Sequence, residues 1–461
     1  MMALASFKTA QSVVGLSESP LFHHQYSSVT AAISTLAKTQ HELKRVRRLF
    51  QRQWITYLLL SGYKLHWQTD GVSLFREHSR CLPETQFVVK ANNRIRGNKP
   101  VGIGYPLSLV NIADFESSWS LPFELRRVKS WEDVVKVGAE QIKEICGREE
   151  FKGHLHINAC DSSYGTAKYI TQVFAIKNLV NVIRLRHGIK VWESESRKTG
   201  GADRIYGAQY YLTEKTGIKK YPKKKAEYEV EQISIYDKKA DSVSEIEKVT
   251  RKGKRLRIEL RRWKRIKMRT SAFRGNSMKE VEFDVVGIRV FEKETGERVF
   301  KHDVFVAIVG EERERMSLEE CAEEFYHRFD LEVTNRFMKQ NLFLENYQTP
   351  EVQHVDNWLV IVQAAMWLTW SGSREVEKVC SKWQKYSEPK AEKGGRKTAS
   401  ETRKGLERLF LTFEKESFLP KKCKKGRGRE KGEEQEKRVE YKVVKKGKAV
   451  GNWTKPSLQR E

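Results

Sequence analysis

Three acidic side chains, far apart in the sequence, have the type and the predicted placement to bind divalent metal ions. Asp70 and Asp161 each end a stretch with strand-like alternation, and Glu332 lies in a helical pattern further along the chain. Open α/β sheets bind ligands at the carboxyl ends of their strands. Three carboxylates from two strands and a helix suit Mg²⁺ or Mn²⁺ better than Zn²⁺, which prefers histidine and cysteine. Two such ions about 3.5–4 Å apart can activate water and stabilise the leaving oxygen when a phosphodiester is hydrolysed.

These residues also have ordinary structural interpretations. A strand-end aspartate commonly caps a turn. Asp114 in "NIADF" follows a predicted strand as well, so it competes with Asp70 for the same role. We prefer Asp70 because it lies on the first predicted strand. His154 and His156 in "GHLHINACD" alternate along a strand, which is more typical of sheet residues than of metal ligands.

The segment around Glu332 carries a distinctive charge pattern. In "FYHRFDLEVTNRFMKQ", Arg328, Glu332, Arg336 and Lys339 are spaced by four, four and three residues, which predicts a single helix face. Cations beside a metal-binding carboxylate could hold DNA phosphates next to the ion. The same spacing is typical of a salt-bridge stripe on an exposed helix, and the spacing alone favours neither interpretation.

The chain as a whole is strongly basic. Its 461 residues include 87 Lys+Arg and 60 Asp+Glu, which gives a net charge of +27. Such an excess indicates a polyanionic partner, with nucleic acid as the first candidate and an acidic membrane surface as the second. A hydrophobic content of 39%, with 11 Trp, 16 Tyr and 21 Phe, predicts that most of the chain folds, into two or three domains.

Several classes of protein are disfavoured. The six cysteines form no CxxC pair, which argues against a zinc site or a disulfide framework and favours a reducing compartment. The N-terminus lacks the cationic start and sustained apolar run of a secretory signal. The most apolar run, "WLVIVQAAMWLTW" (358–370), is too short to span a bilayer, so we expect a buried helix there. The predicted location is cytoplasmic, with no membrane partner.

The elements that must position these side chains alternate between strand and helix patterns. Residues 63–186 predict three strands, a helix, a strand, a helix and a strand, which is an α/β layer with helices covering the sheet. Residues 1–61 are predicted helical, and their basic cluster "KRVRRLFQR" could contact phosphates or form a solvated helix face. Strand patterns return over 256–310, and a capping box of Ser317 and Glu320 starts the next helix.

Together these features resemble the DDE-type insertion-sequence transposases, in the subgroup with a Tyr-x2-Arg-x3-Glu-x6-Lys signature. Arg328, Glu332 and Lys339 match that spacing. Phe325 takes the tyrosine position, and Tyr326 comes one residue late. "NACDSSYGTAKYI" resembles the family's segment around its second aspartate, and "LHWQTDGVSLFREHSRCLPETQF" resembles its first-aspartate strand with the arginine-containing run that follows.

The resemblance covers roughly residues 17–385 and implies an α/β fold. The expected architecture is a ribonuclease-H-like mixed sheet flanked by helices, with a β-rich insertion before the last catalytic helix and a helical N-terminal region. The predicted domains are a DNA-binding region over 1–61, the catalytic core over 62–186 and 313–385, a basic β-rich insertion over 187–312, and a basic, mostly disordered tail over 386–461.

The resemblance further implies a DNA transposase that cuts transposon ends and transfers the freed 3′-hydroxyl into target DNA. Asp70, Asp161 and Glu332 would be both the catalytic and the metal-binding residues, with two Mg²⁺ (or Mn²⁺) ions as cofactors. The implied partners are terminal inverted repeats, target DNA and a second copy of the chain, since two ends must be brought together. In a prokaryote such a protein would associate with the nucleoid. The expected DNA contacts are Phe325, Tyr326, Arg328, Arg336 and Lys339, of which Arg336 rests on the charge stripe alone.

Two other functions stay open at this point. A transposase-derived protein could bind DNA without catalysis, although all three carboxylates are present. A metal-dependent nuclease could cut DNA without joining it to another site.

Overall fold

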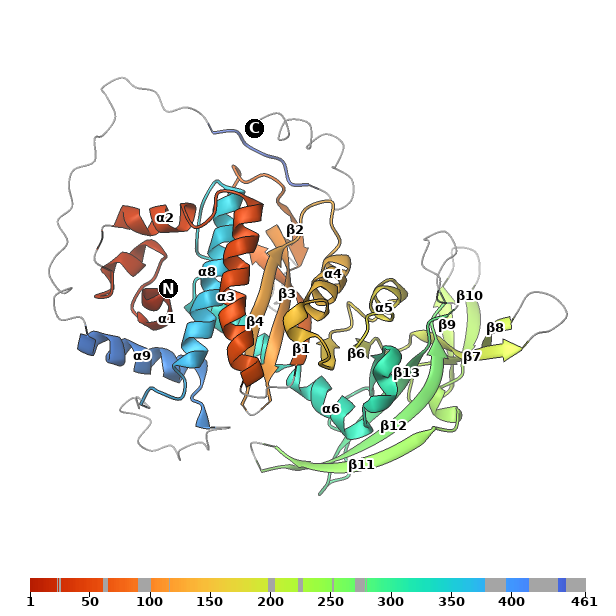
Figure 1. Cartoon of the computed structure of the whole chain (residues 1–461). Coiled ribbons are helices and arrows are strands. Elements are labelled where there is room, and N and C mark those ends of the chain that lie inside the picture. The colour runs from red at the N-terminus through yellow and green to blue at the C-terminus, as the bar shows by residue number, and fades with distance from the viewer. Residues whose placement is uncertain are drawn as a thin grey trace. The chain divides into compact units, whose positions relative to one another are not determined.

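A computed structural model of the chain describes residues 1–22, 24, 26–60, 65–89, 101–115, 117–197, 204–222, 227–250, 253–269, 278, 280–377, 395–413 and 438–444. Helices flank a large, mostly antiparallel sheet, which confirms the predicted mixed α/β class (Figure 1). The chain divides into two compact units. Unit 1 comprises Met1–Tyr63, Asp70–Gly138 and Asp330–Glu461, and unit 2 comprises Lys64–Thr69 and Ala139–Phe329. This division cuts through the predicted core segment 62–186, because strand β1 (Leu65–Phe75) contributes residues to both units.

The strands of unit 1 form an antiparallel group. Strand β3 (Val101–Asp114) pairs antiparallel with β2 (Gln86–Val89) and with β4 (Trp119–Arg127), and it also neighbours β1. Strand β4 was not among the predicted strands, and it contains Pro122. A proline is tolerated there because β4 is described as pairing with β3 alone and the register shifts between Val110 and Asn111, beside the proline's partner.

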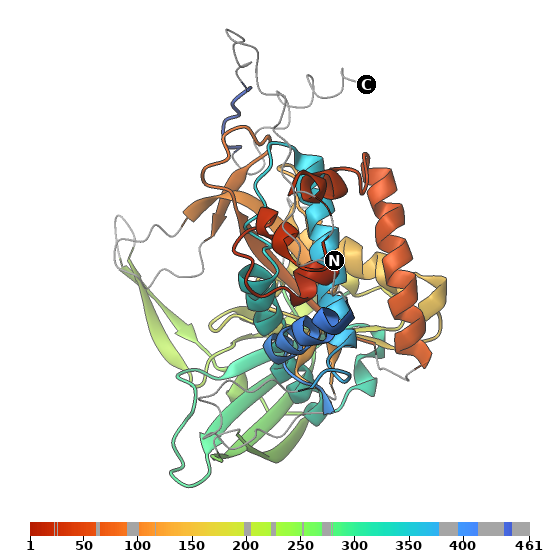
Figure 2. The same ribbon diagram turned by 90° about the vertical axis from the view of Figure 1, so that its left-hand side faces the viewer.

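The helices of unit 1 gather around α8 (Val352–Ser371), which is buried along most of its length, as predicted for 358–370. It lies against β4 and contacts α1 (Met2–Ser6), α2 (Tyr26–Ser34), α3 (Gln40–Leu60) and α9 (Ala399–Phe413) (Figure 2). Helix α9 falls within the predicted disordered tail, and the rest of that tail lies outside the described residues except for 395–398 and 438–444. No helix among the described residues is both long and apolar enough to cross a bilayer.

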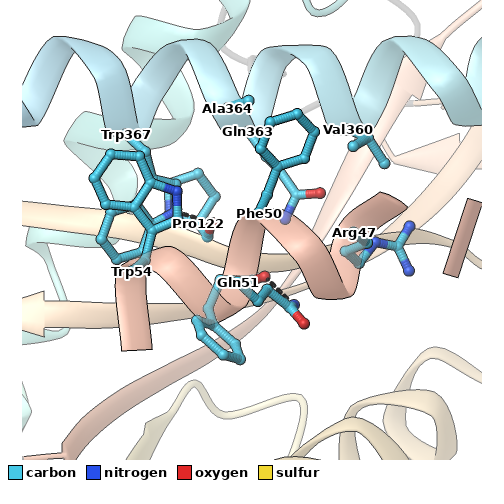
Figure 3. A pocket seen from close by; sticks show the side chains of 10 residues that line it. Arg47, Phe50, Gln51, Trp54, Pro122, Val360, Gln363, Ala364 and Trp367 are labelled. Carbon is cyan, nitrogen blue, oxygen red and sulfur yellow. Dashed lines mark hydrogen bonds between the residues drawn. The ribbon is translucent and has the colours of Figure 1, made fainter. Parts of the chain in front are cut away.

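The inner face of α3 packs against α8 and β4 (Figure 3). The ring of Trp54 stacks on that of Trp367 with centroids 4.7 Å apart. The side-chain amide of Gln51 donates a hydrogen bond to the carbonyl oxygen of Phe123 at 2.7 Å. The remaining cavity has a volume of about 20 Å³, enough for a single water molecule. This contact is therefore a packing seam and not a ligand site.

Unit 2 begins with parallel pairing. Residues 65–69 of β1 pair in parallel with β5 (His156–Cys160), and β5 pairs in parallel with β6 (Leu179–Leu185). Most of α4 (Val134–Cys146) precedes β5 in this unit, and α5 (Ala167–Val173) connects β5 to β6, as βαβ connections require.

The sheet of unit 2 continues from β6 as an antiparallel series. Its order is β6, β14 (Val304–Val309), β13 (Phe283–Glu292) and β12 (Arg255–Lys267). Strand β12 also pairs with β11 (Ser242–Val249) and β7 (Lys190–Arg197), and β7 pairs with β8 (Arg204–Tyr211). Strands β9 (Gly217–Pro222) and β10 (Glu227–Gln232) form a separate antiparallel pair. The short 3-10 helices are η1 (Val14–Glu18) in unit 1, and η2 (Glu149–Phe151), η3 (Ile235–Asp237) and η5 (Glu311–Arg315) in unit 2.

His156 is a core residue of unit 2. Its side chain is 1% exposed, and its Nδ1 accepts a hydrogen bond from the indole N–H of Trp67 at 2.9 Å. Burial lowers the pKa of His156 from 6.5 to about 4. The folded protein therefore keeps this imidazole neutral at pH values where the unfolded chain protonates it.

This difference predicts a pH-dependent stability. The contribution of His156 to the free energy of unfolding is fully present above pH 6.5. It falls by up to about 3 kcal/mol as the pH drops toward 4, because the unfolded chain binds a proton at His156 that the folded chain does not. In His156→Gln, the free energy of unfolding measured by urea titration should vary less steeply with pH over this interval. His78→Gln removes an exposed histidine and should keep the slope of the natural protein. Equal slopes in all three proteins would contradict the prediction.

Candidate functional site

Asp161 directly follows β5 and opens the turn that leads into α5. Its Oδ1 accepts a hydrogen bond from the amide of Ser163 at 2.6 Å. Gly165 lets this turn approach β6 closely, since a Cβ there would lie 2.6 Å from the carbonyl oxygen of Arg184. The turn holds the half-buried Asp161 carboxylate at the carboxyl end of β5.

A buried polar network supports the strand ends beside this turn. The hydroxyl of Thr69 on β1 donates to Oδ1 of Asn158 at 2.8 Å. The amide of Asn158 donates to Oδ1 of Asn181 on β6 at 2.9 Å and to the hydroxyl of Tyr169 on α5 at 3.1 Å. Because buried polar groups without partners are costly, this network favours one arrangement of the three strands and α5.

Asp70 lies inside a strand, and not at the end of one as predicted. Strand β1 continues to Phe75, because Gly71 adopts extended backbone here and does not end the strand. The half-buried Asp70 carboxylate accepts a hydrogen bond at Oδ1 from the amide of Gly71 at 2.8 Å. Thr69 and Cys160 are partners in the parallel register of β1 and β5, and Asp70 and Asp161 are the residues that follow them in sequence.

Asp114, the competitor of Asp70, has a structural role. It is 1% exposed and forms an ion pair with Arg396, whose Nε lies 3.2 Å from Asp114 Oδ2. The indole N–H of Trp370 donates to the same oxygen at 3.2 Å. A carboxylate enclosed by these partners stabilises unit 1 and is poorly placed to bind a substrate.

The predicted continuous helix around Glu332 is two helices. The capping box of Ser317 and Glu320 is confirmed and starts α6 (Leu318–His327), and α7 (Asp330–Asn341) follows. Arg328 is the C-cap of α6, and the amide of Phe329 bonds to the carbonyl of Tyr326 at 3.2 Å, three residues back. Arg328 therefore lies between the two helices, and the prediction that it belongs to one continuous helix with Arg336 and Lys339 is wrong.

The residues predicted at the start of that stripe are largely enclosed in unit 2. Phe325 is 3% exposed and belongs to the core between α6 and the sheet, which does not fit stacking on a DNA base. The ring of Tyr326 packs beside it, and burial raises the pKa of its hydroxyl to about 12. Arg328 is 5% exposed, with its guanidinium 4.6 Å from the ring centroid of Phe329, so direct contact with a phosphate is also disfavoured.

The positive charge of Arg328 also makes a small contribution at the end of β5. Burial raises the pKa of the Cys160 thiol to about 12, and the positive charge of Arg328 opposes this shift. Cys160 immediately precedes Asp161. Arg328 thus contributes positive potential at the strand end that carries the candidate metal-binding aspartate.

Helix α7 presents the remaining predicted residues in unit 1. Glu332 is exposed in its first turn, and Arg336 is exposed one turn later. Lys339 donates a hydrogen bond through Nζ to the carbonyl oxygen of Ser73 on β1 at 2.9 Å, and it pairs with Glu345 at 2.8 Å. Lys339 therefore connects α7 to the strand that contains Asp70.

The predicted site residues thus divide between the two units. Unit 1 contains Asp70, Glu332, Arg336 and Lys339, and unit 2 contains Asp161, Phe325, Tyr326 and Arg328.

The basic cluster on α3 has an exposed outer face. Arg47 is partly buried, 3.6 Å from Glu124, and belongs to the packing side of the helix. The exposed cations of the cluster are Lys44, Arg45, Arg48 and Arg52. Four exposed positive charges within about two turns form a surface suited to phosphate groups.

One cluster was missed by the sequence analysis. His187, Glu214 and His302 place their ligand atoms within 4.8 Å of one another in unit 2. They come from three separate loops at wide and irregular spacing, so no motif in the sequence indicated that they meet.

No protein-family model matches the chain, and no curated protein sequence matches it.

Proposed function

We propose that the protein is a DNA transposase that cuts the ends of a mobile element and joins them to target DNA. The observation that carries the proposal is the parallel register of Thr69 with Cys160, each of which is followed directly by an aspartate. Asp161 follows the carboxyl end of β5, where parallel sheets bind ligands, and Asp70 follows the last residue of β1 that pairs in parallel with β5. Both carboxylates have Oδ1 held by a backbone N–H, and oxygen donors of this kind are the ligands that Mg²⁺ or Mn²⁺ prefers.

The strand order supports a ribonuclease-H-like core. Strand β1 has β3 as one neighbour and β5 as the other, β4 lies beyond β3, and β6 lies beyond β5. Strands β5 and β6 are parallel to β1 and are preceded by α4 and α5, respectively. An order of β4-β3-β1-β5-β6 with this connectivity is typical of ribonuclease-H-like sheets. The further strands β7 to β14 would then be additions to that core.

The candidate residues would have separate metal-binding and DNA-binding roles. We propose Asp70 and Glu332 of unit 1 and Asp161 of unit 2 as the carboxylate ligands of two Mg²⁺ or Mn²⁺ ions, which would supply charge stabilisation for in-line attack on phosphorus. Water attacks in the cleavage step and the freed 3′-hydroxyl in the joining step, so one set of carboxylates serves both. Arg336 on α7 and the exposed face of α3 would bind the DNA backbone.

The test uses DNA that carries the sequences flanking the gene, since terminal inverted repeats are expected there. End-labelled DNA, a circular target and Mg²⁺ are incubated with the full chain. Cut ends joined to the target support the transposase. Cutting without joining would identify a nuclease, and binding without cutting would identify an inactive DNA-binding derivative.

Binding to DNA should depend steeply on salt. Several phosphate contacts predict a loss of affinity on the order of a thousandfold between 50 and 200 mM salt, because bound cations are released from the DNA. Replacing Arg48 and Arg52 together by glutamine should lower the slope of log affinity against log salt by about two. Fluorescence anisotropy of a labelled duplex measures both quantities.

The paired control, Lys143→Gln with Lys152→Gln, removes two exposed charges of unit 2 and should keep the slope of log affinity against log salt. Salt-insensitive binding would refute this mode of recognition.

A further inference from the structure

Three loops of unit 2 bring a glutamate and two histidines together. His187 follows β6, Glu214 follows β8 and His302 precedes β14. Glu214 Oε2 lies 2.9 Å from His187 Nε2, and Glu214 Oε1 lies 3.3 Å from His302 Nδ1. The two imidazole centroids are 4.3 Å apart. One carboxylate thus lies between two imidazole nitrogens.

We propose that His187, Glu214 and His302 bind a transition-metal ion of the Zn²⁺ class. Two histidines with one glutamate are a donor set of zinc sites that keep a fourth position open. Metal–ligand bonds of about 2.1 Å in a tetrahedral site place the ligand atoms about 3.4 Å apart. The two histidine nitrogens lie 2.9 and 3.3 Å from the two oxygens of Glu214, and one ligand atom from each of the three residues lies within 4.8 Å of the others, so side-chain adjustments could bring them to this spacing. The donor set differs from the carboxylates proposed for Mg²⁺, so the two sites are chemically distinct.

The glutamate is held in place by neighbouring groups. Its Oε1 accepts a hydrogen bond from the backbone amide of Asp303 at 2.8 Å. The Asp303 carboxylate is itself held by Arg289, at 2.8 Å, and by Arg298. The backbone amide of Asp303 therefore orients the carboxylate before a metal ion arrives, as supporting hydrogen bonds do in metal sites.

The open side of this site faces a basic pocket. His187 and His302 line a pocket of about 440 Å³ together with Arg184, Arg186 and Ser162. Glu214 is not among the residues that line this pocket, so solvent would reach a bound ion from the side of the two histidines. The fourth ligand would be water or an oxyanion that the two arginines attract.

The proposal is tested by metal binding, independently of any action on DNA. The full chain, purified without a histidine tag and treated with chelator, is titrated with Zn²⁺ in competition with a chromophoric chelator. We expect one tight equivalent, and Co²⁺ in its place should give the visible absorption of a four-coordinate site. His302→Gln and Glu214→Gln should each weaken binding by at least about tenfold.

Two matched controls isolate the site. His78→Gln removes an exposed histidine of unit 1, and Asp161→Ala removes a proposed Mg²⁺ ligand, and both should retain the Zn²⁺ affinity. Circular dichroism of the metal-free variants checks that they are folded, and His187→Gln gives a second test if one variant is not. Absence of a tight equivalent in the natural protein, or equal affinity in folded ligand variants, would overturn the proposal.

Discussion

Asp161→Ala should abolish metal-dependent cleavage of DNA, with a loss of rate on the order of a thousandfold or more. A metal ion contributes several kcal/mol of charge stabilisation in the transition state of phosphodiester cleavage, and losing one of its carboxylate ligands removes most of that contribution. Asp70→Ala and Glu332→Ala should have effects of similar size. Under the proposed function, binding to the transposon ends should change by only a few-fold, since cations on other elements would contact the phosphates.

Controls separate chemistry from folding. Glu323→Ala removes an exposed carboxylate of α6 and should retain full cleavage. Thermal unfolding of Asp161→Ala should match that of the natural protein within a few degrees, since its carboxylate contributes one turn hydrogen bond. Cleavage by Asp161→Ala in Mg²⁺ would refute the assignment. If only Glu332→Ala still cleaves, the helix carboxylate is wrong and the two strand aspartates are retained.

Asp284→Ala should destabilise unit 2 by about 3–5 kcal/mol, because it leaves a charged arginine buried without its partner. Asp284 is fully buried, and its Oδ2 lies 2.5 Å from Nη2 and 2.8 Å from Nε of Arg262. Arg262 also donates to the carbonyl oxygens of Met316 at 2.8 Å and Arg313 at 3.0 Å. The pair therefore joins β12 and β13 to the segment that precedes α6.

Hydrogen exchange of the β12 and β13 amides measures this effect locally, which is suitable for a chain of two units. Glu245→Ala is the matched control. It breaks an exposed ion pair between Glu245 on β11 and Arg257 on β12, the strand that carries Arg262, in which Oε2 and Nη1 lie 3.4 Å apart. Its loss should cost less than about 1 kcal/mol. Arg262→Met combined with Asp284→Leu should recover part of the loss, since the two buried charges of the pair are removed together, while Arg313 still loses its contact with Asp284. Protection in Asp284→Ala equal to that of the control would contradict the assigned role.

Local patterns in the sequence determined several elements correctly. Strand-like patterns and β-branched residues predicted β5 and β6, a long apolar run predicted the buried helix α8, and the pair Ser317 and Glu320 predicted the start of α6. These features depend on residues a few positions apart, whose side chains meet as soon as the element forms. The mixed α/β class follows from the order of such elements.

Other features depended on partners distant in the sequence. Strand β4 was not predicted, and only the fold shows that its Pro122 lies opposite a register shift in β3. The helical spacing around Glu332 did not reveal the turn at Arg328, because residues of a tight turn keep nearly helical backbone angles.

The sequence by itself determined the composition, the charge and the candidate carboxylates of this protein, and the tertiary structure decided which of them have structural partners. Asp114 and Asp70 had equivalent sequence contexts, and Arg396, far along the chain, identified Asp114 as part of a buried ion pair. His187, Glu214 and His302 form a cluster through three loops that only the folded sheet brings together. The physical reason is that packing of the whole chain, and not the neighbouring residues, sets which side chains from distant segments come into contact.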